Sequence, residues 1–328
     1  TQSSLVSLIH DNNTGFLNQY GMYSTNNLGF FDFNITGNEG NLLFYPVKFK
    51  FNNYYVTSVS FSLDDTVSGV GTTDLGDSVR IRTTTSTIPT GTNSPITIVG
   101  IASTYRSSKV LVQIGATDSS YYEYDEITYI HNGSEVFFLD YGQISTDNFF
   151  TKSTSGIGTY NAYISGSDVV IDIIPNNSTT VDYIVNTFNV SLANTSLSGI
   201  GTQIVGGASL ESFSVSIASS TSPVANEIAS YSNTTNDCSY SIISIEDKTN
   251  SQYQICEFLT STDLVNNECH ILEFGTLTSD DYLGITTAGV LGSSTKIYFT
   301  PVENVDIDVK VFQVTLKLSE NSEQLDLI

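Results

Sequence analysis

The sequence has no tryptophan, one methionine, and only 11 lysines and arginines against 34 aspartates and glutamates in 328 residues. Its formal net charge is -23. A surface this acidic repels phosphate backbones, so nucleic-acid binding is not expected. No run of about eighteen apolar residues occurs, so we expect no membrane-spanning helix and no membrane insertion. No secretory signal peptide is visible.

Cysteine is also scarce. Cys238, Cys256 and Cys269 lack the paired spacing that would hold zinc, so we expect free thiols. A disulfide between Cys238 and Cys256 stays open if the two lie on neighbouring strands. The single methionine, Met22, is internal. We therefore expect that the sequence begins after processing or is a piece of something longer.

Short segments rich in β-branched and aromatic residues make up most of the sequence. Examples are "LLFYPVKFKF" at 42–51, "KVLVQIG" at 109–115 and "VKVFQVTLKL" at 309–318. Apolar and polar residues largely alternate in them, and Gly, Asn, Asp and Ser fill the stretches between, as tight turns require. No window has capped helical periodicity. The sequence predicts an all-β protein.

An internal repeat organises these segments. "HDNNTGFLNQYGMYSTNN" from His10 matches "HNGSEVFFLDYGQISTDN" from His131, and "ILEFGTLTSDDY" is a third copy without the histidine. Each copy continues to a strand that ends at proline and then to a closing strand: "VSFSL", "FNVSL" or "FQVTL". The residues that recur as structural anchors are Tyr20, Gly21, Pro46, Tyr141, Gly142, Pro175, Phe274, Gly275 and Pro301.

The front of the unit recurs only twice. "VSGVGTTD" at 67–74 matches "LSGIGTQI" at 197–204, and Tyr122 and Glu126 match Tyr253 and Glu257. We therefore predict tandem antiparallel β-sandwich (immunoglobulin-like) units at 66–195 and 196–328, with Gly142 and Gly275 at equivalent turns. Residues 1–65 carry only the back half of a unit, because their front half is missing. Upstream sequence or a partner subunit is expected to complete it.

The residues of the middle unit carry a family resemblance. The run "YRSSKVLVQIG" through "GIGTYNAYISGSDVVIDIIP" (105–175) resembles a module recurrent in virion structural proteins of contractile-tailed phages that infect marine cyanobacteria. The last unit departs from it, because "YSNTTNDCSY" lacks the Arg and Lys and Leu264 stands where His would be. The matching residues of the middle unit are Tyr105, Arg106, Lys109, Glu126, His131, Asn132, Gly133, Tyr141, Gly142 and Pro175.

Catalytic and ligand-binding interpretations are weaker. His131 with Asp140 and Ser134 or Ser145 could in principle activate a nucleophile. The Tyr-Gly pair nevertheless survives in a copy without histidine, so we interpret His131 as a turn residue near the surface. Nothing singles out a carboxylate pair for glycoside hydrolysis. The turns "SGVGT" and "SGIGT" read as linkers, because no helix follows them to hold an anion.

Acid-rich turns have no EF-hand spacing, so bound calcium is not favoured. These turns lie at Asp64 with Asp65, Asp280 with Asp281, and Asp306 with Asp308. We therefore predict no catalytic residues, no cofactor and no metal.

The resemblance implies a non-enzymatic virion protein, located in the phage particle as an accessory component of tail or neck. Its partners would be other virion proteins and copies of itself. Two alternatives stay open: a fibre or adhesin that binds a host glycan or protein through tyrosine-rich loops such as "SSYYEYDE" (119–126), and a capsid decoration protein.

Overall fold

The chain folds entirely into antiparallel β-sheet over the part that the structure describes, as the sequence predicted. The structure is a computed structural model. It describes residues 2–10, 15–24, 29–36, 39–46, 60–61, 63, 70–146, 156–176, 179–194, 201–205, 208–220 and 222–317.

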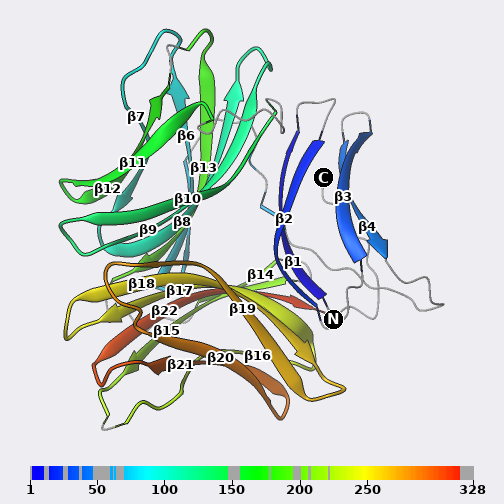
Figure 1. The fold of residues 1–328 in the computed structure, drawn as a ribbon, viewed down its shortest axis with the longest axis vertical. Helices are drawn as coiled ribbons and strands as arrows, with labels where there is room; N and C mark the ends of the chain where they lie inside the picture. Colours follow the sequence, from blue (N-terminus) through cyan, green and yellow to red (C-terminus); the bar gives the residue numbers. More distant parts are fainter. Residues whose placement is uncertain are drawn as a thin grey trace.

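The middle of the chain forms one β-sandwich (Figure 1). A six-stranded sheet has the order β10-β9-β8-β13-β6-β5, and a three-stranded sheet has the order β11-β12-β7. The strands are β5 (Gly71–Leu75), β6 (Val79–Ile88), β7 (Ile96–Ala102), β8 (Tyr105–Ala116), β9 (Tyr122–His131), β10 (Val136–Ser145), β11 (Gly158–Ser165), β12 (Asp168–Pro175) and β13 (Tyr183–Ala193).

The last part of the chain repeats this topology strand for strand. Its six-stranded sheet has the order β19-β18-β17-β22-β15-β14, and its three-stranded sheet has the order β20-β21-β16. The strands are β14 (Gly201–Val205), β15 (Ala208–Ile217), β16 (Asn226–Ser232), β17 (Asn236–Asp247), β18 (Gln252–Asp263), β19 (Glu268–Thr278), β20 (Gly284–Leu291), β21 (Ser294–Pro301) and β22 (Ile307–Lys317). Tandem β-sandwich repeats are thus confirmed.

Four strands near the beginning of the sequence form two hairpins beside the sandwiches (Figure 1). They are β1 (Gln2–His10), β2 (Gly15–Ser24), β3 (Gly29–Thr36) and β4 (Glu39–Pro46). In chain order and pairing they correspond to β9, β10, β11 and β12. The predicted closing strand of this unit lies mostly outside the described residues, which include only Phe61, Leu63 and Ser60 there.

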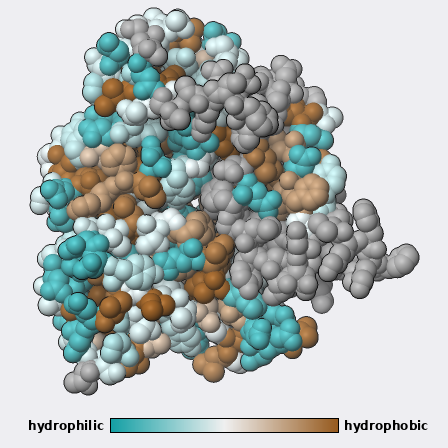
Figure 2. Space-filling view, in the orientation of Figure 1, coloured by the Kyte–Doolittle hydropathy of each residue, from teal (hydrophilic) through white to brown (hydrophobic). Residues whose placement is uncertain are grey.

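Alternating burial shows why these segments are strands. β3 and β11 share one pattern, in which every second residue is exposed, because one face of each hairpin covers a core and the other faces solvent. Pro46, Pro175 and Pro301 are the last residues of β4, β12 and β21, where the missing N–H is tolerated. On the face in Figure 2, apolar side chains form separate groups among hydrophilic ones.

Three large apolar clusters hold the sheets together. One fills the middle sandwich around Val112 and Ile171, and another fills the last sandwich around Phe258 and Phe299. The third joins the two six-stranded sheets to each other, with Leu192 of the middle sandwich and Phe312 of the last one among its members. The two sandwiches therefore share a buried face.

The strand register decides the cysteine question. Cys238 on β17 pairs with Ser261, whereas Cys256 on β18 pairs with Ile243. The two sulfurs therefore lie at different heights on neighbouring strands, and no disulfide joins them. Burial raises the pKa of the Cys256 thiol well above its ordinary value.

Candidate functional site

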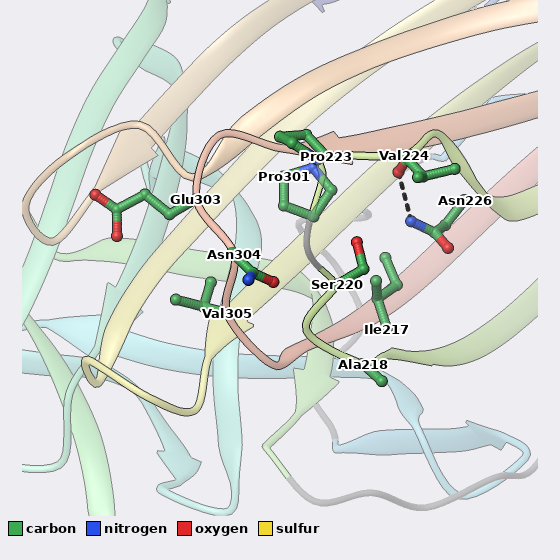
Figure 3. Close-up of a pocket in the computed structure, with 10 residues that line it drawn as sticks. All are labelled: Ile217, Ala218, Ser220, Pro223, Val224, Asn226, Pro301, Glu303, Asn304 and Val305. Carbon is green, nitrogen blue, oxygen red and sulfur yellow. Dashed lines mark hydrogen bonds between the residues drawn. The ribbon is translucent and has the colours of Figure 1, made fainter.

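A shallow hollow lies at one end of the last sandwich (Figure 3). Two loops form it, one after β15 and one after β21. Asn226 donates a 2.6 Å hydrogen bond to the Val224 carbonyl, and the Glu303 side chain points away from the other residues drawn. The hollow brings together no nucleophile and base. Its lining residues are Ile217, Ala218, Ser220, Pro223, Val224, Asn226, Pro301, Glu303, Asn304 and Val305.

His131 is buried at the end of β9 and is not a surface turn residue, which corrects the prediction from sequence. Its Nε2 lies 3.0 Å from the Tyr105 carbonyl oxygen, to which it donates, and its Nδ1 accepts the Gly133 N–H at 3.1 Å. Arg106 donates to the His131 carbonyl at 3.0 Å. Both ring nitrogens are thus used by backbone, and Asp140 pairs instead with Ile127 along the sheet. This geometry does not resemble a catalytic triad.

Replacing His131 with Asn should therefore destabilise the protein by about 1–3 kcal/mol, because the Tyr105 carbonyl and the Gly133 N–H both lose their hydrogen-bond partner. Burial, followed by the nearby Arg106 charge, lowers the pKa of His131. As the pH falls, His131 is protonated in the unfolded chain at a higher pH than in the folded protein. The stability that neutral His131 contributes should therefore fall as the pH drops below about 6.5. Urea unfolding of both proteins at pH 5 and pH 8 tests this. If the urea midpoint of His131→Asn equals that of the unsubstituted protein, His131 behaves as the surface turn residue that the sequence predicted.

The Tyr-Gly anchors form β-bulges inside strands, and not the turns that the sequence suggested. Opposite β9, Tyr141 pairs with Glu126 and Ile144 pairs with Tyr124, so two residues of β10 face one residue of β9. β19 has the same bulge after Phe274, and β2 has it after Tyr20. Gly142 and Gly275 have φ values of 73° and 59°, the left-handed conformation that such a bulge requires.

Gly275 is also crowded, both by Glu257 of its own sandwich and by Tyr141 of the neighbouring one. A Cβ atom there would lie 2.9 Å from Glu257 Oε1 and 3.0 Å from the Tyr141 hydroxyl. Gly292 has a similar φ of 61° but open space around it. We expect Gly275→Ala to cost at least about 1 kcal/mol more than Gly292→Ala, because only Gly275 adds a clash to the shared backbone strain. If thermal unfolding shows the same loss of stability for Gly275→Ala and Gly292→Ala, the neighbours of Gly275 move aside at no cost in free energy.

The buried face between the sandwiches is the most elaborate polar site among the described residues, and we treat it as the candidate functional site. Lys109 of β8 is almost fully buried there and forms ion pairs with Glu126 of its own sandwich and, at 2.9 Å, with Glu257 of the other. Its Nζ lies 4.1 Å from the centre of the Tyr141 ring. One cation thus links two carboxylates that belong to different repeats.

Tyrosine and threonine hydroxyls complete this network. Tyr141 donates to Glu257 Oε1, and Tyr240 donates to Glu257 Oε2 at 2.5 Å. Thr128 lies 3.2 Å from the Tyr141 hydroxyl. Both oxygens of the buried Glu257 carboxylate therefore have partners, as a buried charge requires.

The electrostatics favour the charged lysine. Burial opposes the charge on Lys109, but the carboxylates of Glu257 and Glu126 outweigh it and raise the pKa above its ordinary value. Lys109 stays charged throughout the physiological range, so the ion pairs are a permanent part of the junction.

Arg106 forms a second link across the same face. Its guanidinium lies 4.3 Å above the centre of the Tyr253 ring and 3.4 Å from Glu246 Oε1, both in the last sandwich. Arg106, Lys109, Glu126 and Tyr141 all lie in the middle repeat, and the structure brings them together at this junction. The last sandwich has Asp237 and Tyr240 at the positions of Arg106 and Lys109.

The structure reveals a pair of buried carboxyl groups that the sequence analysis did not identify. Glu123 and Asp125 alternate on β9 and point toward the three-stranded sheet, where Tyr160 donates to Asp125 at 2.5 Å and Ile157 N–H donates to Glu123 at 2.9 Å. Burial, and then the charge of Glu123, raises the pKa of Asp125 to about 9. The alternation on one strand could have indicated a shared face, but burial came only with the fold.

Asp125→Asn should stabilise the protein at pH 8. The raised pKa means that Asp125 is protonated in the folded protein at a pH at which it is ionised in the unfolded chain. Its contribution to stability is therefore complete below about pH 4 and declines as the pH rises toward 9, because taking up the proton costs more free energy at higher pH. Asparagine is neutral in both states and avoids this cost, so we expect a gain in stability above about 1 kcal/mol at pH 8 and a smaller gain at pH 5. Glu135→Gln, on an exposed loop, is the control. A loss of stability at pH 8 would contradict the assignment.

Aspartates of the acid-rich turns pair with protein groups. Asp308 forms an ion pair with Lys248 at 2.9 Å, and Asp306 accepts the Ser219 N–H at 2.8 Å. Asp280 accepts from Gln252 at 3.2 Å, and Asp64 and Asp65 lie outside the described residues. Across the described ranges, histidine, cysteine and acidic side chains nowhere gather in a group of three that could bind a metal ion.

Comparison with protein-family models, with curated proteins and with solved structures finds no match to this chain. In the part of the chain that the structure covers, no helix has the length and apolarity needed to cross a bilayer.

Proposed function

We propose that this chain is a non-enzymatic structural protein of a phage particle, an accessory component of tail or neck whose β-sandwich repeats mediate contacts between subunits. One observation carries the proposal. The residues that resemble the virion module, Arg106, Lys109, Glu126 and Tyr141, belong to a buried junction between repeats and not to a ligand pocket. A junction with an apolar cluster and buried ion pairs suits a rigid connecting element.

Particles purified from the phage that encodes the chain test this role. Mass spectrometry should find the chain in stoichiometric amount, and gold-labelled antibodies should mark the tail or neck. Label over the head shell would favour a capsid decoration protein. Absence from washed particles would overturn the proposal.

A host-surface binder is the second candidate, and one observation favours it. Phe30 and Tyr45 lie side by side on β3 and β4, 53% and 42% exposed, with ring centres 5.3 Å apart in a stacked arrangement. Exposed aromatic faces can bind sugars or anchor a protein interface. Gold label at a fibre tip, together with loss of host adsorption in Phe30→Ser, would establish this alternative.

A further inference from the structure

One strand of the last sandwich has no neighbouring strand on its outer side. β20 ends the three-stranded sheet, whose order is β16-β21-β20, and its residues pair only with β21 within the described part of the chain. This sheet lies on the side of the last sandwich that faces away from the middle one (Figure 1). The outer edge of β20 therefore has backbone N–H and C=O groups that no other described strand pairs with.

The solvent-facing side of β20 has two large aliphatic residues. Ile285 is 57% exposed and Leu291 is 61% exposed. Thr287 between them is also exposed, and a Cβ atom added at Gly289 would have no neighbour within 4 Å. Because side chains alternate along a strand, these four residues lie on the same face of the sheet. An open edge with apolar residues is suited to pairing with another strand.

The other sheet edges of the two sandwiches have features that oppose such pairing. β5, β10, β16 and β19 each have a charged residue. β7 buries most of its large side chains, and β14 is short, with only 5 residues. β11, the equivalent of β20, exposes Thr159, Asn161, Tyr163 and Ser165 in place of aliphatic residues. β20 has neither a charged residue nor an internal proline.

The sequence of β20, "GITTAGVL", complements a second copy of itself. Ile285 and Leu291 lie at equal sequence distances from Ala288. In an antiparallel pair of β20 strands centred on Ala288, Ile285 of each copy is therefore opposite Leu291 of the other copy. The exposed aliphatic residues then contact each other twice across a two-fold axis, and no like charges meet because the strand is uncharged.

The acidic residues near β20 do not oppose this arrangement. Asp280 and Asp281 precede the strand, and antiparallel pairing places the aspartates of the two copies at opposite ends of the paired strands. They are then more than about 25 Å apart, well beyond the Debye length of about 8 Å in physiological salt. Salt at this concentration also screens most of the repulsion between two chains of net charge -23.

We propose that a second copy of this chain binds at the edge of β20 through its own β20, so that two three-stranded sheets join into one six-stranded sheet across a two-fold axis at Ala288. A second copy is the occupant that this edge fits, because its two exposed aliphatic residues complement each other in the two-fold arrangement. A contact through one short strand is smaller than a standard interface, so the dimer dissociates on dilution.

Sedimentation velocity of residues 1–328 in about 0.15 M salt measures this association, and we expect the mass to rise toward that of a dimer as the concentration approaches about 100 μM. Ile285→Lys combined with Leu291→Lys places lysines directly opposite each other twice, so the dissociation constant should rise by about tenfold or more. The two lysines reduce the net negative charge, so greater overall repulsion cannot cause this change. A monomer at every concentration, or a dimer that both lysines leave unchanged, overturns the proposal.

A charge swap tests the register. Ile285→Lys combined with Leu291→Glu places a lysine opposite a glutamate at both positions of the proposed pairing, so the dissociation constant should return to within about threefold of the unsubstituted value. Within one copy the two positions are about 20 Å apart along the strand and do not pair with each other. If this variant associates as weakly as the one with two lysines, the antiparallel register is wrong and the proposal fails.

The matched control is Thr159→Lys combined with Ser165→Lys, at the equivalent exposed positions of β11, and it should leave the association unchanged. An equal loss in this control would place the interface elsewhere and overturn the proposal. All of these positions are exposed, so thermal unfolding should show that each variant is folded. The inference goes beyond the proposed function, and no phage particle enters the experiment. Its failure therefore leaves the proposed function standing, and absence of the chain from particles leaves this inference standing.

Discussion

Lys109→Met should lower the free energy of unfolding by about 3–5 kcal/mol, one of the two largest effects that we expect from a single substitution. The methionine keeps most of the side-chain volume, but Glu126 and Glu257 then remain buried next to each other without their cation. Urea or guanidinium unfolding at pH 7 measures the loss. The contribution of Lys109 is complete below about pH 10.4, where the unfolded lysine is charged, and is lost at higher pH as the raised folded pKa is passed.

Two further variants separate the cost of leaving buried carboxylates without their cation from the cost of lost packing around Lys109. Arg80→Ala removes an ion pair with Asp74 that is exposed at the surface, and it should cost no more than about 1 kcal/mol. Adding Glu126→Gln and Glu257→Gln to Lys109→Met should recover most of the loss, because no unpaired charge is left. If Lys109→Met costs no more than Arg80→Ala, the network does not stabilise the junction.

Phe312→Ala should cost about 3–5 kcal/mol, because it empties a fully buried site at the centre of the junction. Phe188 is the matched control, since it has the same position in the equivalent strand but is only partly buried, against Phe61 and the edge of the junction cluster. Phe188→Ala should therefore cost clearly less, about 1–2 kcal/mol. Thermal and denaturant unfolding of both variants gives the comparison.

The difference between the free-energy losses of Phe312→Ala and Phe188→Ala measures how much burial at the junction stabilises this strand position. Equal costs for the two variants would mean that the partly buried Phe188 contributes as much to stability as the fully buried Phe312.

The sequence by itself determined the all-β class and the order of the repeated strands. Alternation in segments such as 109–115 fixes which side chains share a face, and this is a local property of strand geometry. The recurring Tyr-Gly and proline landmarks identified equivalent strands because a left-handed glycine and a missing N–H are tolerated at few positions. The sequence did not reveal that Gly142 lies in a bulge, since a turn and a bulge use the same residue.

Only the tertiary structure decided which faces of the repeats meet. His131 was expected at the surface, but the strand end on which it lies is covered by Tyr105 and Arg106. Lys109 and Glu257 are 148 residues apart in the sequence and become partners because two equivalent six-stranded sheets pack against each other. Sequence periodicity records what lies within one sheet, whereas contact between sheets depends on their shape and on the charges that both faces leave unpaired.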